Sequence, residues 1–377
     1  MLRKSGQKQR RPASNGNLHV FHSRWRSAWI AAVCVILLLA VGRFVVHDPN
    51  ESSASSYQAP TPTRSRDFSL FVLGAGGGPV DARVSGFALL PPNSASDLIC
   101  FDCGTLRHSL HGVAKYFGSS SRHVHQNMIA AYLVSHAHLD HISGMVIASA
   151  DERSPDKGPK PIVGLNETLS ALHMHIFNNQ VWPDMPGFGF FFYQELEPRL
   201  VVQHLGRAQG GLNVIAFPVS HGKSYLSTCF LLGYNLSDFS LHEGDAILLC
   251  GDLGSDSNEG TNLNEDMWSA LAPLIINHRL KTILIECSFP SETPSHLLFG
   301  HLTPILLLEE LHVLASKVRS SLAGLRIIVQ HIKESDLDDV TGRSATVDAI
   351  KIELMRLNNL KVDILFAHEF IGNKIDL

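Results

Sequence analysis

The chain contains the segment Val134-Ser135-His136-Ala137-His138-Leu139-Asp140-His141, and the expected architecture follows from it. This segment directly follows an apolar run, residues 129–134, with the length and composition of a buried strand. Alternate residues of an extended chain point to the same side, so His136 and His138 can reach one metal ion. Asp140 and His141 come where the chain turns into an expected helix, residues 142–149, and can face a second ion. Imidazole and carboxylate groups suit zinc, and also manganese or iron.

Three more polar residues come soon after short apolar runs that predict buried strands. They are His221, Asp252 and His331, which follow residues 214–217, 246–250 and 327–330. In layered α/β folds, ligand sites assemble at the edge where such strands end. We therefore expect these three side chains to join the first four at one site.

The rest of the chain predicts an α/β fold. Further strand-like runs occupy residues 68–74, 98–101 and 282–285, and helical patterns lie at residues 305–318 and 346–357. Strands that are apolar on both faces, separated by helices, are typical of a layered fold with covered sheets.

Composition limits the possible partners. The chain has 377 residues, of which 45% are hydrophobic and 18% charged, so a large core can form. Its formal net charge of −4 gives no general attraction to long nucleic acids. A small anionic substrate stays possible, because bound metal ions would supply local positive charge.

The N-terminal region divides into three segments before the main domain, residues 67–377. Residues 1–26 form a basic tail without acidic residues, residues 27–47 an apolar transmembrane or signal-anchor segment, and residues 48–66 a flexible stalk. The basic flank favours a single-pass membrane protein with a cytoplasmic N-terminus and its folded domain on the other side. A cleaved signal peptide, which would give a secreted protein, and an organellar transit peptide are the alternatives.

Several further segments share one resemblance. They are Val72–Pro79, Phe101–Thr105, His136–Gly144, Phe177–Pro183, Glu286–Pro290 and Gly300–Pro304. These segments resemble the class II 3′,5′-cyclic nucleotide phosphodiesterases of the metallo-β-lactamase superfamily. The resemblance extends over about residues 68–370. The resemblance implies an α/β fold, a four-layer αββα sandwich with the site at one edge of the sheets.

The resemblance also implies a ligand set for two divalent metal ions, with zinc favoured over manganese or iron. The first ion would be held by His136, His138 and His221, the second by Asp140, His141 and His331, with Asp252 bridging both. The implied reaction is hydrolysis of cyclic AMP, cyclic GMP or both to 5′-nucleoside monophosphates by a hydroxide activated between the ions. Asp140 is thus also a candidate catalytic residue.

Two residues are candidates for contact with the substrate. His301 lies in the Gly300–Pro304 segment and is expected to act as the general acid or to contact the phosphate. Trp182, with the aromatic run 188–193, is expected to form a flap that stacks on the base; packing of this loop on the body is the alternative.

Other functions stay open at this point. The same fold supports a tRNA 3′-processing nuclease or a thioester or lactone hydrolase. A non-enzymatic, membrane-anchored module with a catalytically inactive site is a further alternative. The expected partners are a small cyclic nucleotide and, through the N-terminal segment, a membrane, but no long nucleic acid. A homodimer is a candidate assembly.

Overall fold

The computed structural model describes residues 67–153, 158–203, 205, 212–237, 244–334, 336 and 340–377. The expected basic tail (1–26), transmembrane or signal-anchor segment (27–47) and stalk (48–66) lie outside the described residues. In the part of the chain that is described, none of the helices has the length and apolar character that a bilayer crossing requires.

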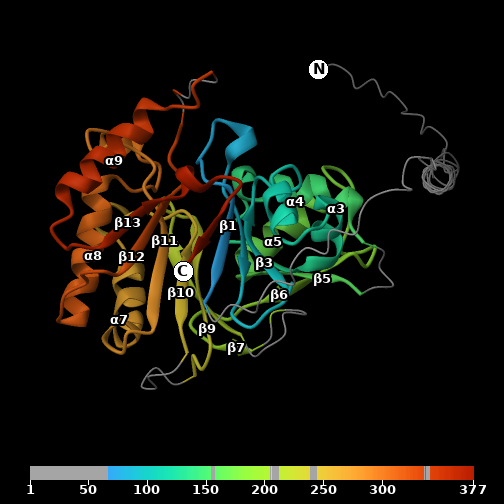
Figure 1. The fold of residues 1–377 in the computed structure, drawn as a ribbon, viewed down its shortest axis with the longest axis horizontal. Coiled ribbons are helices and arrows are strands. Elements are labelled where there is room, and N and C mark those ends of the chain that lie inside the picture. The colour runs from blue at the N-terminus through green and yellow to red at the C-terminus, as the bar shows by residue number, and fades with distance from the viewer. Residues whose placement is uncertain are drawn as a thin grey trace, which may run out of the picture. The chain divides into compact units, whose positions relative to one another are not determined.

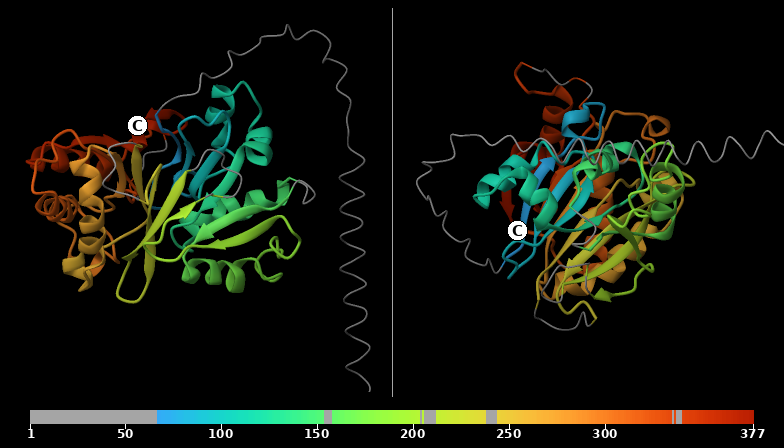
Figure 2. Two further views of the ribbon diagram at one scale, coloured as in Figure 1. Left: turned by 90° about the horizontal axis from the view of Figure 1, so that it is seen from below. Right: turned by 90° about the vertical axis from the view of Figure 1, so that its right-hand side faces the viewer.

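The described residues form two seven-stranded sheets that pack face to face (Figures 1 and 2). The first sheet has the order β14 (Lys374–Asp376), β1 (Ser69–Gly74), β2 (Gly86–Leu90), β3 (Leu98–Cys103), β4 (Ile129–Leu133), β5 (Lys160–Gly164), β6 (Phe191–Glu195). The second has the order β13 (Asp363–Phe366), β12 (Arg326–Gln330), β11 (Leu280–Glu286), β10 (Ala246–Cys250), β9 (Leu226–Gly233), β8 (Asn213–Ser220), β7 (Val202–Gln203). Strands β3 to β6 are parallel, as are β10 to β13, and the other neighbours are antiparallel.

Helices cover the outer face of each sheet, which gives four layers (Figures 1 and 2). The helices on the side of the first sheet are α2 (Leu110–Tyr116), α3 (Ser121–His123), α4 (Leu139–Ala148) and α5 (Asn166–Ala171). Those on the side of the second sheet are α7 (Leu263–Ile276), α8 (Pro304–Val318) and α9 (Ala345–Leu357), and the short α6 (Asp256–Glu259) precedes α7. Single 3₁₀ or π turns lie at Asp81–Arg83, Val124–Met128, Ser149–Asp151, Leu172–Ile176, Ser295–Leu297 and Ala367–Phe370.

Strands β1 to β5 of the first sheet each contribute to two cores. In β1, Leu70 and Val72 face the second sheet, whereas Phe71 and Leu73 pack under the outer helices. This alternation follows from the two-residue repeat of an extended chain. A third core lies between the second sheet and its helices, where Trp268 of α7 is fully buried and donates its indole N–H to Glu310 of α8 at 2.8 Å. The expected αββα sandwich is therefore confirmed.

The strands and helices expected within residues 67–377 are present. Seven strands correspond to the apolar runs of the sequence. They are β1, β3, β4, β8, β10, β11 and β12, at the runs 68–74, 98–101, 129–134, 214–217, 246–250, 282–285 and 327–330. The helices expected at 142–149, 305–318 and 346–357 are α4, α8 and α9. Helix α4 begins earlier than expected, at Leu139, which places Asp140 in its first turn.

Candidate metal centre

The seven predicted metal ligands meet at one edge of the sandwich. His136 and His138 follow β4, and Asp140 and His141 lie in the first turn of α4. From the second sheet, His221 follows β8, Asp252 follows β10 and His331 follows β12. Their ligand atoms fall into two groups within the described residues, and each group spans no more than 4.8 Å. The site therefore joins the two sheets.

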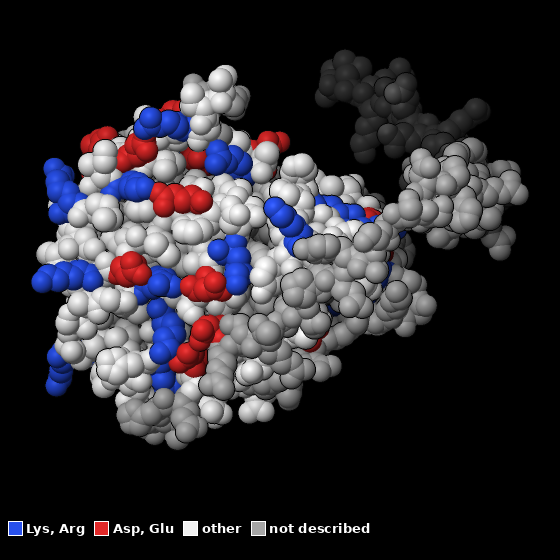
Figure 3. Space-filling view, in the orientation of Figure 1, with Lys and Arg blue, Asp and Glu red and all other residues white. Residues whose placement is uncertain are grey.

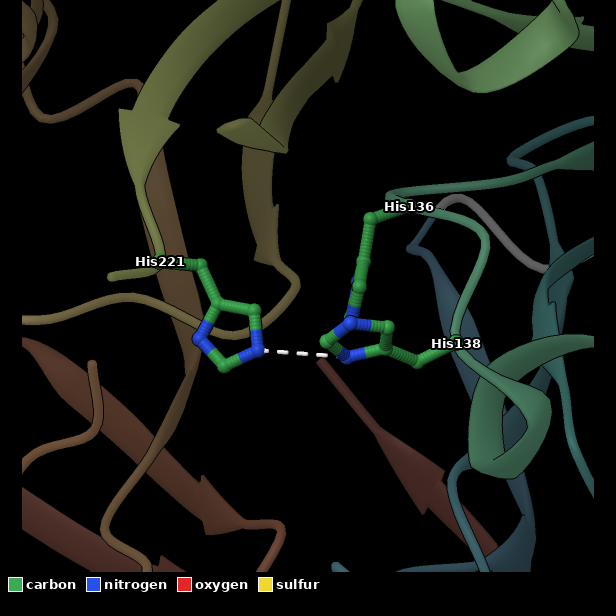
Figure 4. A group of neighbouring side chains, drawn as sticks. All are labelled: His136, His138 and His221. Atoms are coloured by element: carbon green, nitrogen blue, oxygen red, sulfur yellow. Dashed lines mark hydrogen bonds between the residues drawn. The ribbon is translucent and has the colours of Figure 1, made fainter. Parts of the chain in front are cut away.

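The first group consists of His136, His138 and His221 (Figure 4). Nε2 of His221 and Nδ1 of His138 lie 3.3 Å apart, and the ring of His136 lies beside both. Burial lowers the pKa of His136 well below 6.5 and that of His138 to about 4. Both imidazoles are therefore neutral at physiological pH, which is the form that binds a metal.

The second group consists of Asp140, His141, Asp252 and His331. Nε2 of His141 lies 3.0 Å from Nε2 of His331, and Oδ2 of Asp140 lies 3.3 Å from the same His331 atom. Burial raises the pKa of Asp140, but His331 and His141 outweigh it and hold that pKa far below its usual value. The carboxylate therefore stays ionised and offers an oxygen ligand.

Asp252 lies between the two groups and presents one oxygen to each. Its Oδ2 is 3.8 Å from Nε2 of His136 and 3.7 Å from Nε2 of His221. Its Oδ1 is 3.3 Å from Nε2 of His141 and 3.2 Å from Nε2 of His331. A carboxylate placed in this way suits a bridging ligand of a two-metal site.

The hydrogen bonding of these residues fits bound metal ions. Nε2 of His136 and Oδ1 of Asp252 are buried and have no hydrogen-bond partner among the described residues. Leaving such groups unpaired in an interior is costly, whereas coordination would satisfy both. On the opposite side of the rings, Nδ1 of His221 donates to the carbonyl of Gly300 at 3.0 Å, and Nδ1 of His141 donates to Asp102 at 2.8 Å. Partners of this kind direct the other ring nitrogen toward a metal.

Asp102 contacts a candidate metal ligand, and the sequence analysis proposed no role for it. Its fully buried carboxylate, at the end of β3, accepts hydrogen bonds from the backbone N–H of Ser135 at 2.9 Å, from Ser135 Oγ at 2.8 Å and from His141 Nδ1 at 2.8 Å. The criterion that identified Asp252, a polar residue where a buried strand ends, would have identified Asp102 as well.

Tyr225 is a second neighbour of the site that the sequence did not predict. Its ring stacks on that of His138, with centroids 4.8 Å apart and planes 6° apart. Its hydroxyl accepts a hydrogen bond from the backbone N–H of Ala137 at 3.2 Å. Tyr225 thus fixes the orientation of one candidate ligand, and no motif in the sequence marked it.

His301 lies at the same centre, as the sequence suggested. Its Nδ1 is 2.8 Å from Oε1 of Glu286 and 3.8 Å from Oδ2 of Asp252. Burial lowers the pKa of His301, but the carboxylate of Glu286 outweighs it and raises that pKa above 6.5. Glu286 therefore favours a His301 ring that carries a proton to donate.

Trp182 lies with the outer helices of the first sheet. Its indole N–H donates to Ser149 Oγ at 2.9 Å, and its ring packs against the core beneath those helices. Residues 191–193, expected in a flap, instead form part of the edge strand β6, because they pair with β5 through the backbone. The expectation of a flap is wrong for these three residues, and a substrate contact by Trp182 stays a prediction.

The surface charge is mixed on the face shown in Figure 3. There, Lys and Arg side chains are interspersed with Asp and Glu side chains rather than gathered into a continuous basic surface. The described residues also form ion pairs, such as Arg326 with Asp363 at 3.1 Å. This arrangement gives that face no strong field of one sign.

Comparisons with known proteins agree with this geometry. Residues 110–369 match the family model of class-II cAMP phosphodiesterases. A 3′,5′-cyclic-nucleotide phosphodiesterase of Aliivibrio fischeri is 32% identical over 326 residues, 81% of this chain and 92% of the relative. One from Schizosaccharomyces pombe is 32% identical over 313 residues, 75% of this chain and 86% of the relative.

Solved structures show the same fold. Unliganded yeast PDE1 has a TM-score of 0.71 and 28% sequence identity, over 82% of this chain and 99% of that one. The metallo-β-lactamase fold protein YhfI from Bacillus subtilis has a TM-score of 0.52 and 14% identity, over 82% of this chain and 100% of that one. The chain has the metallo-β-lactamase fold and belongs to the family of class-II cAMP phosphodiesterases.

Proposed function

We propose that this chain hydrolyses 3′,5′-cyclic nucleotides, cyclic AMP or cyclic GMP or both, to 5′-nucleoside monophosphates. Membership of the class-II family supports the reaction. The observation that carries the proposal is the position of Asp252 between two groups of candidate ligands, with one carboxylate oxygen toward each.

Two divalent ions, with zinc favoured, are the proposed cofactors. The first would be held by His136, His138 and His221, the second by Asp140, His141 and His331, and Asp252 would be shared. Bound there, such ions lower the pKa of water toward neutrality and neutralise charge on the phosphate. The predominance of imidazole ligands favours zinc, although manganese and iron accept the same donors.

A protein group would donate a proton to the leaving oxygen. His301 is the proposed general acid for the departing 3′ oxygen, because Glu286 both orients its ring and raises its pKa. Asp140 is the second candidate catalytic residue. Its side chain is 26% exposed, whereas that of Asp252 is buried, so a substrate can reach Asp140.

A direct assay tests the proposal. Full-length chain loaded with zinc is given cyclic AMP and cyclic GMP, and in parallel an RNA precursor and a thioester. We expect 5′-AMP or 5′-GMP by chromatography, loss of turnover after chelation, and recovery with zinc. Asp363→Asn, which alters only an exposed ion pair on the second sheet, is the control and should behave like the wild type. Zinc-loaded protein without turnover of either cyclic nucleotide would contradict the proposal.

We also propose that residues 27–47 attach the chain to a membrane, with the catalytic domain on the non-cytoplasmic side. The basic flank of residues 1–26 supports this orientation. Fractionation of cells that express the full chain, followed by protease protection, tests it. Recovery of intact full-length chain without membranes would contradict it, and size-exclusion chromatography of the detergent extract tests the candidate homodimer.

A further inference from the structure

An open cavity of about 590 Å³ lies directly beside the metal centre. Its walls come from the loop after β8, from α6 and from the segment Ser295–Gly300. The volume lies within the range of small-molecule sites. No candidate metal ligand lines this cavity, so it is available for a part of the substrate that does not contact the ions.

The cavity begins one residue from two histidines of the site. Gly222 follows His221, and Gly300 precedes His301. The two walls are in close contact, because the Gly300 carbonyl accepts the hydrogen bond from His221 Nδ1 at 3.0 Å. A Cβ atom at Gly300 would lie 2.2 Å from the backbone nitrogen of Gly222, so only glycine allows this approach. In a 3′,5′-cyclic nucleotide, the base is attached to the ribose that carries the cyclic phosphate. A phosphate at the metal centre therefore places the base in an adjoining space such as this one.

Phe299 has two features that packing within the chain does not explain. Its side chain is 69% exposed at the rim of the cavity. Its φ of +50° is unusual for a bulky residue and precedes the φ of +81° at Gly300. Strained backbone at non-glycine residues concentrates at ligand sites. An exposed aromatic ring next to the site is suited to stack on a nucleobase.

The lining of the cavity also carries polar groups that can hydrogen-bond to the edge of a base. Asn258 of α6 lines the cavity, and its backbone N–H is held by Ser255 Oγ at 3.4 Å. An asparagine amide offers both a donor and an acceptor, which match the N6 and N7 atoms of adenine. Lys223 and His296 line the same space. Glu259 forms part of the wall, where its carboxylate accepts a hydrogen bond from Ser220 Oγ at 3.3 Å.

We propose that this cavity is the base-binding site of the enzyme, with Phe299 stacked on a purine and Asn258 hydrogen-bonded to its edge. The inference rests on the proposed cyclic-nucleotide hydrolysis and adds to it the residues that recognise the base.

The test separates base recognition from chemistry by the choice of substrate. Full-length, zinc-loaded protein is assayed with cyclic AMP and with bis(p-nitrophenyl) phosphate, a phosphodiester that has no purine. For Phe299→Ala, we expect a KM for cyclic AMP raised about 5- to 150-fold, the range of one lost base stack. Turnover of bis(p-nitrophenyl) phosphate should stay within about twofold of the wild type, since the metal centre is unchanged. Phe299→Trp should retain the wild-type KM for cyclic AMP.

The control variant is Ile352→Ala in α9, because Ile352 is 67% exposed, much like Phe299, and lies outside the cavity. It should leave both substrates unaffected. An unchanged KM for cyclic AMP in Phe299→Ala would overturn the inference, and so would an equal loss on both substrates. Wild-type protein that cleaves bis(p-nitrophenyl) phosphate but neither cyclic nucleotide would instead overturn the proposed function, and the inference with it.

Asn258→Ala provides an independent measurement. It should change the ratio of kcat/KM for cyclic AMP to that for cyclic GMP by about 5- to 150-fold, because edge contacts discriminate between bases. An unchanged ratio would show that Asn258 does not contact the base edge and would overturn that part of the proposal.

Discussion

Replacing Asp102 by asparagine should weaken metal binding, and it should destabilise the fold less than replacing it by alanine does. The carboxylate accepts three hydrogen bonds in the interior: two from Ser135 and one from His141 Nδ1. Asparagine has the same shape, and its remaining oxygen can keep the bond from the Ser135 backbone. Its NH₂ group, however, faces the N–H of His141. The ring then changes tautomer and carries its proton on Nε2, the atom that faces Asp252 and His331.

The magnitude follows from these contacts. A proton on Nε2 removes the lone pair that would bind a metal, and loss of such a positioning partner typically reduces metal affinity by about 10- to 100-fold. The apoprotein should lose only about 1–3 kcal/mol of unfolding free energy, the effect of one poorly paired buried group. Asp102→Ala removes all three acceptor contacts and leaves at least two donors unpaired. It should therefore cost about 2–6 kcal/mol, a large part of a typical domain's stability.

The assay is zinc competition against a chromophoric chelator, combined with urea denaturation of the metal-free protein. Asp363→Asn is the matched control, because it makes the same change on an exposed side chain. The reasoning about the His141 tautomer would be refuted if Asp102→Asn bound zinc as tightly as the wild type. It would also be refuted if Asp102→Asn and Asp102→Ala were equally unstable.

Three other substitutions test separate parts of the structure. Asp252→Asn replaces one of two carboxylate oxygens, each of which faces one ligand group. Metal content should therefore fall and kcat/KM for cyclic AMP should drop by more than about 100-fold, beyond the effect of losing a residue that only orients a ligand; normal metal content would contradict the bridging role. His301→Ala should lower kcat by about 10²- to 10⁴-fold while the bound metal, measured by mass spectrometry, is retained; near-normal turnover would exclude His301 as the general acid. Trp268→Ala empties a fully buried site under α8 and should reduce the unfolding free energy by about 3–5 kcal/mol in urea titrations. The exposed Ile352→Ala should change it by less than about 0.5 kcal/mol, and similar values for the two variants would contradict the packing argument.

Local sequence patterns were sufficient to predict the strands that carry the site. The runs before His136, Asp252 and His331 are aliphatic and end in polar residues, so the strands and the polar residues beyond them could be identified together. Because β4 of the first sheet and β8, β10 and β12 of the second all end toward the same edge, the polar residues beyond them meet there. The assembly of all seven candidate ligands was predictable for that reason.

Some of the elements that the sequence did not predict have weak local signals. Strand β2, Gly86–Leu90, is five residues long and begins with glycine, and the edge strand β6 carries the exposed Phe192. Which sheet a segment joins depends on long-range pairing that no local pattern encodes. Tyr225 is a similar case, because its contact with His138 depends on a loop that returns across the site. The cavity next to Phe299 likewise exists only once three separate segments have met.

Because the site joins both sheets, it has a consequence for how the protein is made. His141 and His331 touch although 190 positions separate them in the chain. During synthesis, strands β1 to β6 of the first sheet emerge first and can begin to fold before the second sheet exists. At that stage, the nascent chain displays His136, His138, Asp140 and His141 without their partners. Ions that need both ligand groups would therefore be captured stably only once β12 and His331 have left the ribosome, late in synthesis or after it.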